Sequence, residues 1–118
     1  MPIAVAPSVV IPDSDIALSF VRSSGPGGQN VNKVSSAAQL RFDLAATAAL
    51  DERVKHRLRA LAGRRLTAEG AILIIARNHR TQERNRAEAL ERLSELVRRA
   101  LAELTARGWV RAERGSGT

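Results

Sequence analysis

Apolar and polar positions alternate in two segments of the first half of the chain. In the first, Ile16, Leu18 and Phe20 share one face of an extended chain, which predicts a strand over residues 16–22. A second strand is predicted over residues 38–44, and its apolar face consists of Ala38, Leu40, Phe42 and Leu44. Because the opposite face of this second strand is polar, we expect it to be half solvated.

Two helices are predicted from apolar side chains that recur every three or four residues. The first spans residues 50–62, with acidic residues at its start and Gly63 at its end, as the two ends of a helix favour. The second begins after an N-cap at Thr81 and ends near Ala106. Its expected buried residues are Leu90, Leu93, Val97, Leu101 and Leu104.

Charged residues four positions apart are expected to form solvated salt bridges on the outer face of this last helix. The two expected pairs are Glu88 with Arg92 and Glu95 with Arg99. Between the helices, residues 71–76 form a short, continuously apolar run that is rich in isoleucine. Because no position of this run is polar, we expect a strand that is covered on both faces and central in the sheet.

These elements predict one compact α+β domain in the order strand, strand, helix, strand, helix, with the last helix packed across a small sheet. Residues 1–13 contain three prolines, which exclude a regular helix, and we expect an extended N-terminal arm there. The folded domain is predicted to span residues 14–106, and residues 107–118 are predicted to be a flexible tail.

A long polar loop, residues 23–36, connects the two predicted strands. It is rich in glycine, serine and asparagine and has almost nothing to bury, so it must lie on the surface. Hairpin loops usually have about two to five residues, and longer ones tend to be functional. At its centre, glycines surround the polar side chain of Gln29, with Arg22 and Lys33 on either side.

The composition favours a polyanionic partner. Nineteen Lys and Arg residues against twelve Asp and Glu residues give a net charge of +7, mostly from arginine, which favours RNA or DNA over an acidic protein. The absence of cysteine excludes a thiolate nucleophile, disulfides and Cys-based metal sites. The only two histidines, His56 and His79, form no recognisable metal-binding or triad pattern, so we expect no metal and no cofactor.

Glutamine is neither an acid nor a base at neutral pH. If Gln29 takes part in hydrolysis, it does so by orienting water or by offering hydrogen bonds to developing negative charge. Adjacent glycines would let the backbone N–H approach that charge closely. Such a device is incomplete alone, so a partner must supply the rest of the active site.

Residues 22–34, with the sequence Arg-Ser-Ser-Gly-Pro-Gly-Gly-Gln-Asn-Val-Asn-Lys-Val, resemble the signature of the Gly-Gly-Gln catalytic domain of class I peptide release factors. The resemblance continues at residues 39–42, 77–82 and 85–86. Release factors proper carry codon-reading domains, which this sequence lacks. The chain therefore most resembles the alternative ribosome-rescue factor B family and its mitochondrial counterparts, which act as stand-alone peptidyl-tRNA hydrolases on stalled ribosomes.

This resemblance implies ribosome-dependent hydrolysis of the peptidyl-tRNA ester in the peptidyl-transferase centre. It implies that Gly27 and Gly28 give the backbone its freedom, and that Gln29 positions water while its N–H stabilises the transition state. It also makes Gln29 a candidate for N-methylation by a glutamine methyltransferase. The residues expected to contact ribosomal RNA are Arg22, Asn32, Lys33, Arg77 and Arg80. We expect a cytoplasmic monomer without a membrane segment.

Rescue factors of this type end in a tail dense in Lys and Arg, whereas residues 108–118 contain only Arg111 and Arg114. We therefore expect that the basic tail is absent or removed. Two alternatives stay open at this stage: a non-catalytic ribosome- or RNA-binding module of the same fold, and a detached catalytic domain of a codon-dependent release factor. The intact glycine-glycine-glutamine tripeptide argues against the first, because a module that only binds has no chemical need for it.

Overall fold

The computed structural model describes residues 3–6, 9–22 and 36–108 of the chain. Its main sheet has three antiparallel strands in the order β3 (Ile16–Arg22), β4 (Ser36–Phe42) and β5 (Ile72–Ala76). Helix α1 (Glu52–Ala62) lies between β4 and β5 in the chain, and helix α2 (Gln82–Ala106) follows β5. The predicted α+β order of these five elements is confirmed.

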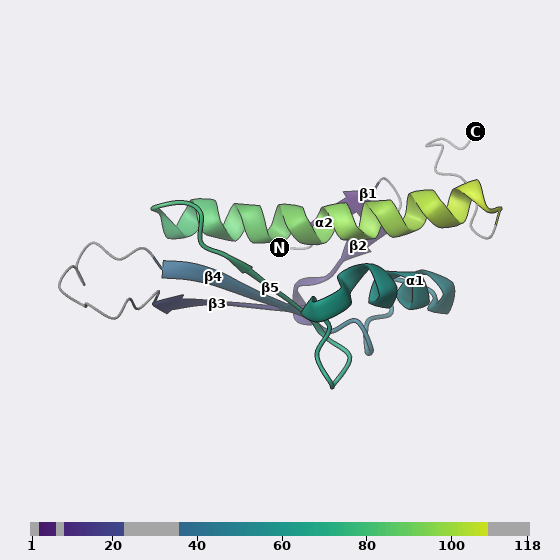
Figure 1. The fold of residues 1–118 in the computed structure, drawn as a ribbon, viewed down its shortest axis with the longest axis horizontal. Coiled ribbons are helices and arrows are strands. Elements are labelled where there is room, and N and C mark those ends of the chain that lie inside the picture. Colours follow the sequence, from purple (N-terminus) through teal and green to yellow (C-terminus); the bar gives the residue numbers. More distant parts are fainter. Residues whose placement is uncertain (1–2, 7–8, 23–35, 109–118) are drawn as a thin grey trace.

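One long helix covers one face of the sheet. Figure 1 shows α2 running along β4 and β5, with α1 beside the later part of α2. The strand register places Leu18, Leu40 and Ile74 in one row across the sheet, on the face that α2 covers. Strand β4 begins and ends two residues earlier than the predicted 38–44. Its predicted apolar residues Ala38, Leu40 and Phe42 are fully buried, and so is Leu44, which follows the strand.

Strand β5 corrects one prediction, because it is an edge strand and β4 is the central one. Its residues Ile72, Ile74 and Ala76 are buried towards α2, whereas Leu73 and Ile75 are only half-buried on the opposite face. A continuously apolar sequence therefore does not require cover on both faces. Strand order is set by which strands pair with one another, and an apolar run does not indicate its pairing partners.

Both helices have polar caps at their starts. The Asp51 carboxylate accepts a hydrogen bond from the Val54 N–H at 3.1 Å, and the Thr81 hydroxyl accepts one from the Arg84 N–H at 3.1 Å. Helix α1 ends at Gly63, whose φ of 57° lies in the left-handed region that favours glycine. Both helices were predicted within two residues of these bounds. Within the described residues, neither is long and apolar enough to cross a membrane.

The N-terminal segment contains two short strands, β1 (Ile3–Ala6) and β2 (Val9–Ile11), which form an antiparallel pair. Strand β1 contacts α2, and Ile11 of β2 is fully buried in the main core. The segment is thus extended, as its prolines require, but it is also joined to the core. Its description as a separate arm, like the other predicted domain boundaries, stays a prediction.

An ion pair joins the two helices away from the sheet. The Arg57 Nε of α1 donates to the Glu103 Oε1 of α2 at 2.5 Å, and the Nε of Arg99 lies 3.6 Å from the other oxygen of Glu103. Arg99 therefore pairs with Glu103 and not, as predicted, with Glu95. The hydrogen bond from Arg57 is the main cause that lowers the pKa of Glu103 below its ordinary value, and burial opposes it only in part.

This pair predicts a stability difference that depends on pH. A carboxyl group whose pKa is lower in the folded state stabilises the fold above its unfolded pKa of about 4.3 and loses that contribution as the pH falls through its folded pKa. We expect Glu103→Gln to lower the free energy of unfolding at pH 7 and to have a much smaller effect near pH 3. Urea unfolding of both proteins at several pH values measures this. A difference that stays constant down to pH 3 would contradict the assignment.

Candidate functional site

The strand register brings two separate parts of the sequence to one end of the sheet. Arg22 pairs with Ser36 at the last step of the β3–β4 ladder, and Ala38 of β4 pairs with Ala76, the last residue of β5. The turn that follows Ala76, residues 77–81, therefore lies at the same end as the strand ends from which residues 23–35 depart. Figure 1 shows this end at the left, where α2 also begins.

The predicted site residues divide into three groups. Five lie outside the described residues, and for them the predicted roles stay predictions: Gly27, Gly28, Gln29, Asn32 and Lys33. Arg22 is the last residue of β3, so its backbone position is known, whereas its side chain is not described. Arg77 and Arg80 are both exposed in the turn at the same end of the sheet. The structure thus brings the backbone of Arg22 to the end that carries Arg77 and Arg80.

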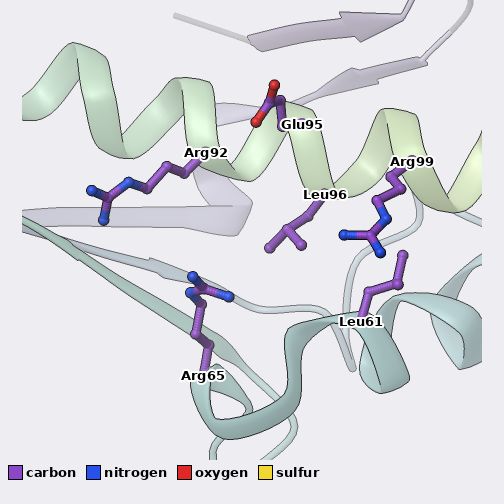
Figure 2. A pocket seen from close by; sticks show the side chains of 6 residues that line it. All are labelled: Leu61, Arg65, Arg92, Glu95, Leu96 and Arg99. Carbon is purple, nitrogen blue, oxygen red and sulfur yellow. The ribbon is translucent and has the colours of Figure 1, made fainter.

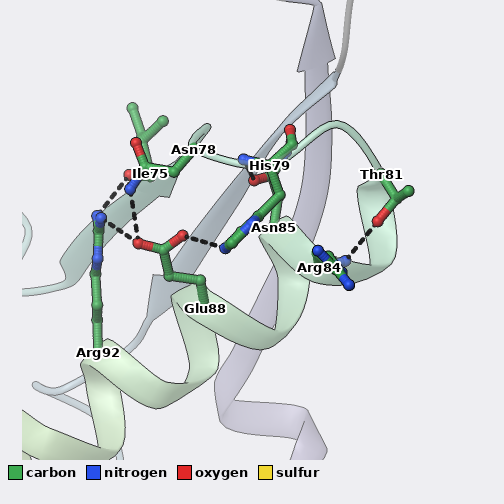
Figure 3. Close-up of polar contacts among 8 residues, drawn as sticks. All are labelled: Ile75, Asn78, His79, Thr81, Arg84, Asn85, Glu88 and Arg92. Carbon is green, nitrogen blue, oxygen red and sulfur yellow. Dashed lines mark hydrogen bonds and ion pairs between the residues drawn. The ribbon is translucent and has the colours of Figure 1, made fainter.

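A buried asparagine holds the backbone of this turn. Asn85 lies in the first turns of α2 and is fully buried. Its Oδ1 accepts a hydrogen bond from the His79 N–H at 2.9 Å, and its Nδ2 donates to the His79 carbonyl at 3.1 Å. Figure 3 shows the Asn85 side chain between the helix and the turn. One side chain therefore satisfies both backbone groups of His79.

The partly buried carboxylate of Glu88 makes the second set of contacts. Glu88 Oε2 accepts hydrogen bonds from the Asn78 side chain at 2.9 Å and from Arg92, whose other nitrogen donates to the Ile75 carbonyl at 3.0 Å. The second oxygen of Glu88, Oε1, is buried and lies 3.1 Å from the His79 Nε2 (Figure 3). When Nε2 carries a proton, it can donate a hydrogen bond to this oxygen, which has no hydrogen-bond partner elsewhere among the described residues.

These contacts also correct the predicted pair of Glu88 with Arg92. Glu88 and Arg92 do pair, but they do not form a solvated bridge on the outer face of α2, because the Glu88 side chain is only 21% exposed. The pair faces β5 and the turn, and it connects α2 to the end of that strand. The positioning roles of Asn85 and Glu88 were missed in the sequence. The available signal was an asparagine inside a helix one turn after the N-cap, where asparagine is a poor helix former.

The charge at this end of the molecule is mainly positive. The exposed arginines of the turn and of the first turns of α2 are Arg77, Arg80, Arg84 and Arg86. The exposed acid among them, Glu83, lies in the first turn of α2, where a helix favours negative charge. Within the described residues, no group of three or more metal-binding side chains comes together. The arrangement is suited to contacts with phosphate groups.

Comparison with known proteins agrees with this geometry. The model of the RF-1 domain family matches residues 5–115, and the match includes the three-stranded sheet, both helices and the signature between β3 and β4. The chain belongs to the RF-1 domain family.

Three relatives differ in how much of their own length the chain covers. Peptidyl-tRNA hydrolase ArfB of Pseudomonas putida is 50% identical to this chain over 95 residues, which are 80% of this chain and 69% of that protein. Large ribosomal subunit protein mL62 of Mus musculus is 37% identical over 93 residues, 79% of this chain and 45% of that protein. Probable peptide chain release factor 1, mitochondrial, of Caenorhabditis elegans is 41% identical over 63 residues, which are only 16% of its length.

The buried asparagine predicts a large loss of stability on truncation. Asn85→Ala leaves the His79 N–H and carbonyl without their partner inside the protein, so we expect the free energy of unfolding to fall by about 2–4 kcal/mol. The exposed Asn78→Ala, which removes one hydrogen bond to Glu88, serves as the matched control and should cost less than about 1 kcal/mol. Urea unfolding measures both, and equal losses would show that Asn85 has no special role.

Proposed function

We propose that this RF-1 domain catalyses ribosome-dependent hydrolysis of the peptidyl-tRNA ester and releases the nascent peptide without reading a stop codon. The observation that carries the proposal is the intact signature at residues 22–34 in a chain that is 50% identical to a protein named peptidyl-tRNA hydrolase. The basic turn at the same end of the sheet supports it, because a loop that enters a ribosomal RNA site needs cationic contacts beside its base.

The reaction is the attack of water on the ester carbonyl carbon. The bond from this carbon to the ribose oxygen of the terminal adenosine breaks, and the ribose oxygen leaves with a proton. In our proposal the Gln29 side chain orients the water, and the Gln29 N–H donates to the developing oxyanion. Gly27 and Gly28 carry no side chain that would hinder this approach.

The turn at this end of the sheet contains one histidine, His79, whose Nε2 lies 3.1 Å from the partly buried Glu88 carboxylate. We assign it to positioning the turn. The remaining catalysis is therefore supplied by the large-subunit peptidyl-transferase centre and by the peptidyl-tRNA itself.

Further parts of the proposal concern the cellular setting. We propose that the protein acts as a monomer in the cytoplasm, where ribosomes work, and that a glutamine methyltransferase modifies Gln29. A second candidate function, binding to the ribosome without hydrolysis, is favoured by the 37% identical relative that is named a large ribosomal subunit protein. Peptide release separates the two candidates.

Gln29 is the side chain on which the proposed hydrolysis depends. On ribosomes stalled on a truncated message, the chain should release labelled peptide, and Gln29→Ala should lower the release rate roughly a hundredfold or more, as loss of a group that acts in the transition state does. Gln39→Ala, which removes a glutamine from the half-buried outer side of β4, is the control. Both variants should melt within a few degrees of the unmodified chain. Ribosome binding without release by the unmodified chain would favour the binding module.

The basic turn carries the proposed RNA contact of Arg80. Arg80→Ala should weaken ribosome binding, and the slope of log affinity against log salt should become shallower by about one unit for each lost phosphate contact. Arg64→Ala removes an equally exposed charge near the opposite end of the sheet and should leave that slope nearly unchanged. Affinity measured from about 50 to 300 mM salt tests this. Equal slopes for the two variants would remove Arg80 from the RNA contacts.

A further inference from the structure

A second basic feature lies away from the turn. Helix α2, the end of α1 and the short 3-10 helix η3 (Gly63–Arg65) enclose a pocket of about 300 Å³. Figure 2 shows its lining residues: Leu61, Arg65, Arg92, Glu95, Leu96 and Arg99. Three of these six are arginines that come from two separate elements, so the basic character of the pocket depends on the tertiary fold.

The arginines of this pocket are only partly neutralised by the protein. Arg65 is exposed, and its side chain forms no ion pair with any other described residue. Arg99 is 66% exposed and lies 3.6 Å from a Glu103 carboxylate that Arg57 already binds more closely. Figure 2 shows both guanidinium groups directed into the space between α2 and η3.

The remaining lining residues fit an organic anion. The carboxylate of Glu95 points away from this space in Figure 2, so it does not neutralise the arginines there. Leu61 and Leu96 give the pocket an apolar wall between them. Arg92 stands at one side, where Glu88 and the Ile75 carbonyl hold its guanidinium in place. Convergent guanidinium groups beside an apolar wall match a phosphate with an attached sugar.

We propose that this pocket binds a phosphodiester of an RNA backbone, with Arg65 and Arg99 on the phosphate oxygens and the ribose against Leu61 and Leu96. The inference rests on the proposed function, which supplies ribosomal RNA and transfer RNA as the available polyanions. Arg92 and Arg99 lie 10 and 17 positions after Gln82, which places the pocket about 15–25 Å along α2 from the basic turn. Two RNA contacts at this separation fix the orientation of the domain, which one contact cannot do.

A charge-matched pair of double variants tests the pocket. Arg65→Ala with Arg99→Ala removes the two pocket cations that have the weakest partners. Arg64→Ala with Arg98→Ala removes the same charge from neighbouring positions that do not line the pocket, and the printed sequence places each one residue before its pocket counterpart. Among the contacts it removes is an exposed pair between Arg98 and Glu91, which contributes little to stability. Because both double variants lose two charges, long-range attraction to RNA falls equally in both, and only a specific contact separates them.

The readout is binding to stalled ribosomes together with peptide release. We expect the pocket variant to need roughly tenfold more protein for half-saturation than the control variant, with an unchanged release rate at saturation. Its salt slope should be shallower than that of the control variant by about one unit. The same half-saturation and the same slope for both variants would overturn the proposal.

Cross-linking identifies what occupies the pocket. The sequence has no cysteine, so Glu95→Cys provides a unique attachment point for an aryl azide at the rim of the pocket, and it leaves the arginines and the apolar wall in place. On stalled ribosomes we expect a cross-link to RNA that disappears when Arg65 and Arg99 are also replaced by alanine. Primer extension and labelled transfer RNA distinguish the two RNA sources. A cross-link to ribosomal protein alone would overturn the proposal and indicate an acidic protein surface instead.

The two proposals fail in different ways. If the unmodified chain binds ribosomes but releases no peptide, hydrolysis is wrong, and the binding and cross-linking experiments still test the pocket. If release is normal and the pocket variant behaves like its charge-matched control, the pocket proposal fails and hydrolysis stands.

Discussion

The packing of α2 against the sheet is the contact on which the other features of this fold depend. Leu93, Val97 and Leu104 are at most 1% exposed, and fully burying such a side chain contributes about 1.5–3 kcal/mol. The helix has 25 residues, which makes it about 37 Å long, whereas a seven-residue strand such as β4 spans about 23 Å. The helix therefore extends beyond the sheet, and this extension packs against α1 and β1. One helix thus carries the basic turn at its start and the basic pocket along its length.

The polar network at the start of α2 follows from this packing. Burying Asn85, and Glu88 in part, is costly unless each finds hydrogen-bond partners. Both side chains find partners in the turn, and Glu88 also binds Arg92 of its own helix. The turn also displays Arg77 and Arg80, whose positive charges repel each other. Two hydrogen bonds to the His79 backbone give this turn a defined conformation despite that repulsion. The arginines are therefore presented to a partner from a fixed backbone.

Much of this architecture could be predicted because each element has a local cause. Alternation predicts β3 and β4, whereas the helices are predicted by acidic residues at the start of α1, a glycine at its end and the N-cap Thr81 of α2. Strand order could not be predicted in this way, because the apolar run of β5 is equally compatible with a central and an edge position. The role of Glu88 could not be predicted either. Its four-residue spacing to Arg92 identifies a partner on the same helix, but it does not indicate the contact with His79 in the turn. The pocket arises from residues 61–65 meeting residues 92–99, a contact between distant segments that no local pattern encodes.

The candidate site was also predictable only in part from the sequence. The motif at residues 22–34 could be recognised because it is continuous in sequence, whereas the position of its first residue, Arg22, at the same end of the sheet as the turn at residues 77–81 depends on the antiparallel register of three strands. That register brings the base of the motif and the exposed Arg77 and Arg80 together without requiring contact between their side chains. A net charge of +7 and the exposed arginines at this end suit the domain to a polyanionic partner. The proposed function therefore divides the work between the two: the domain contributes positioning and positive charge, and the partner that it is proposed to bind completes the catalytic site.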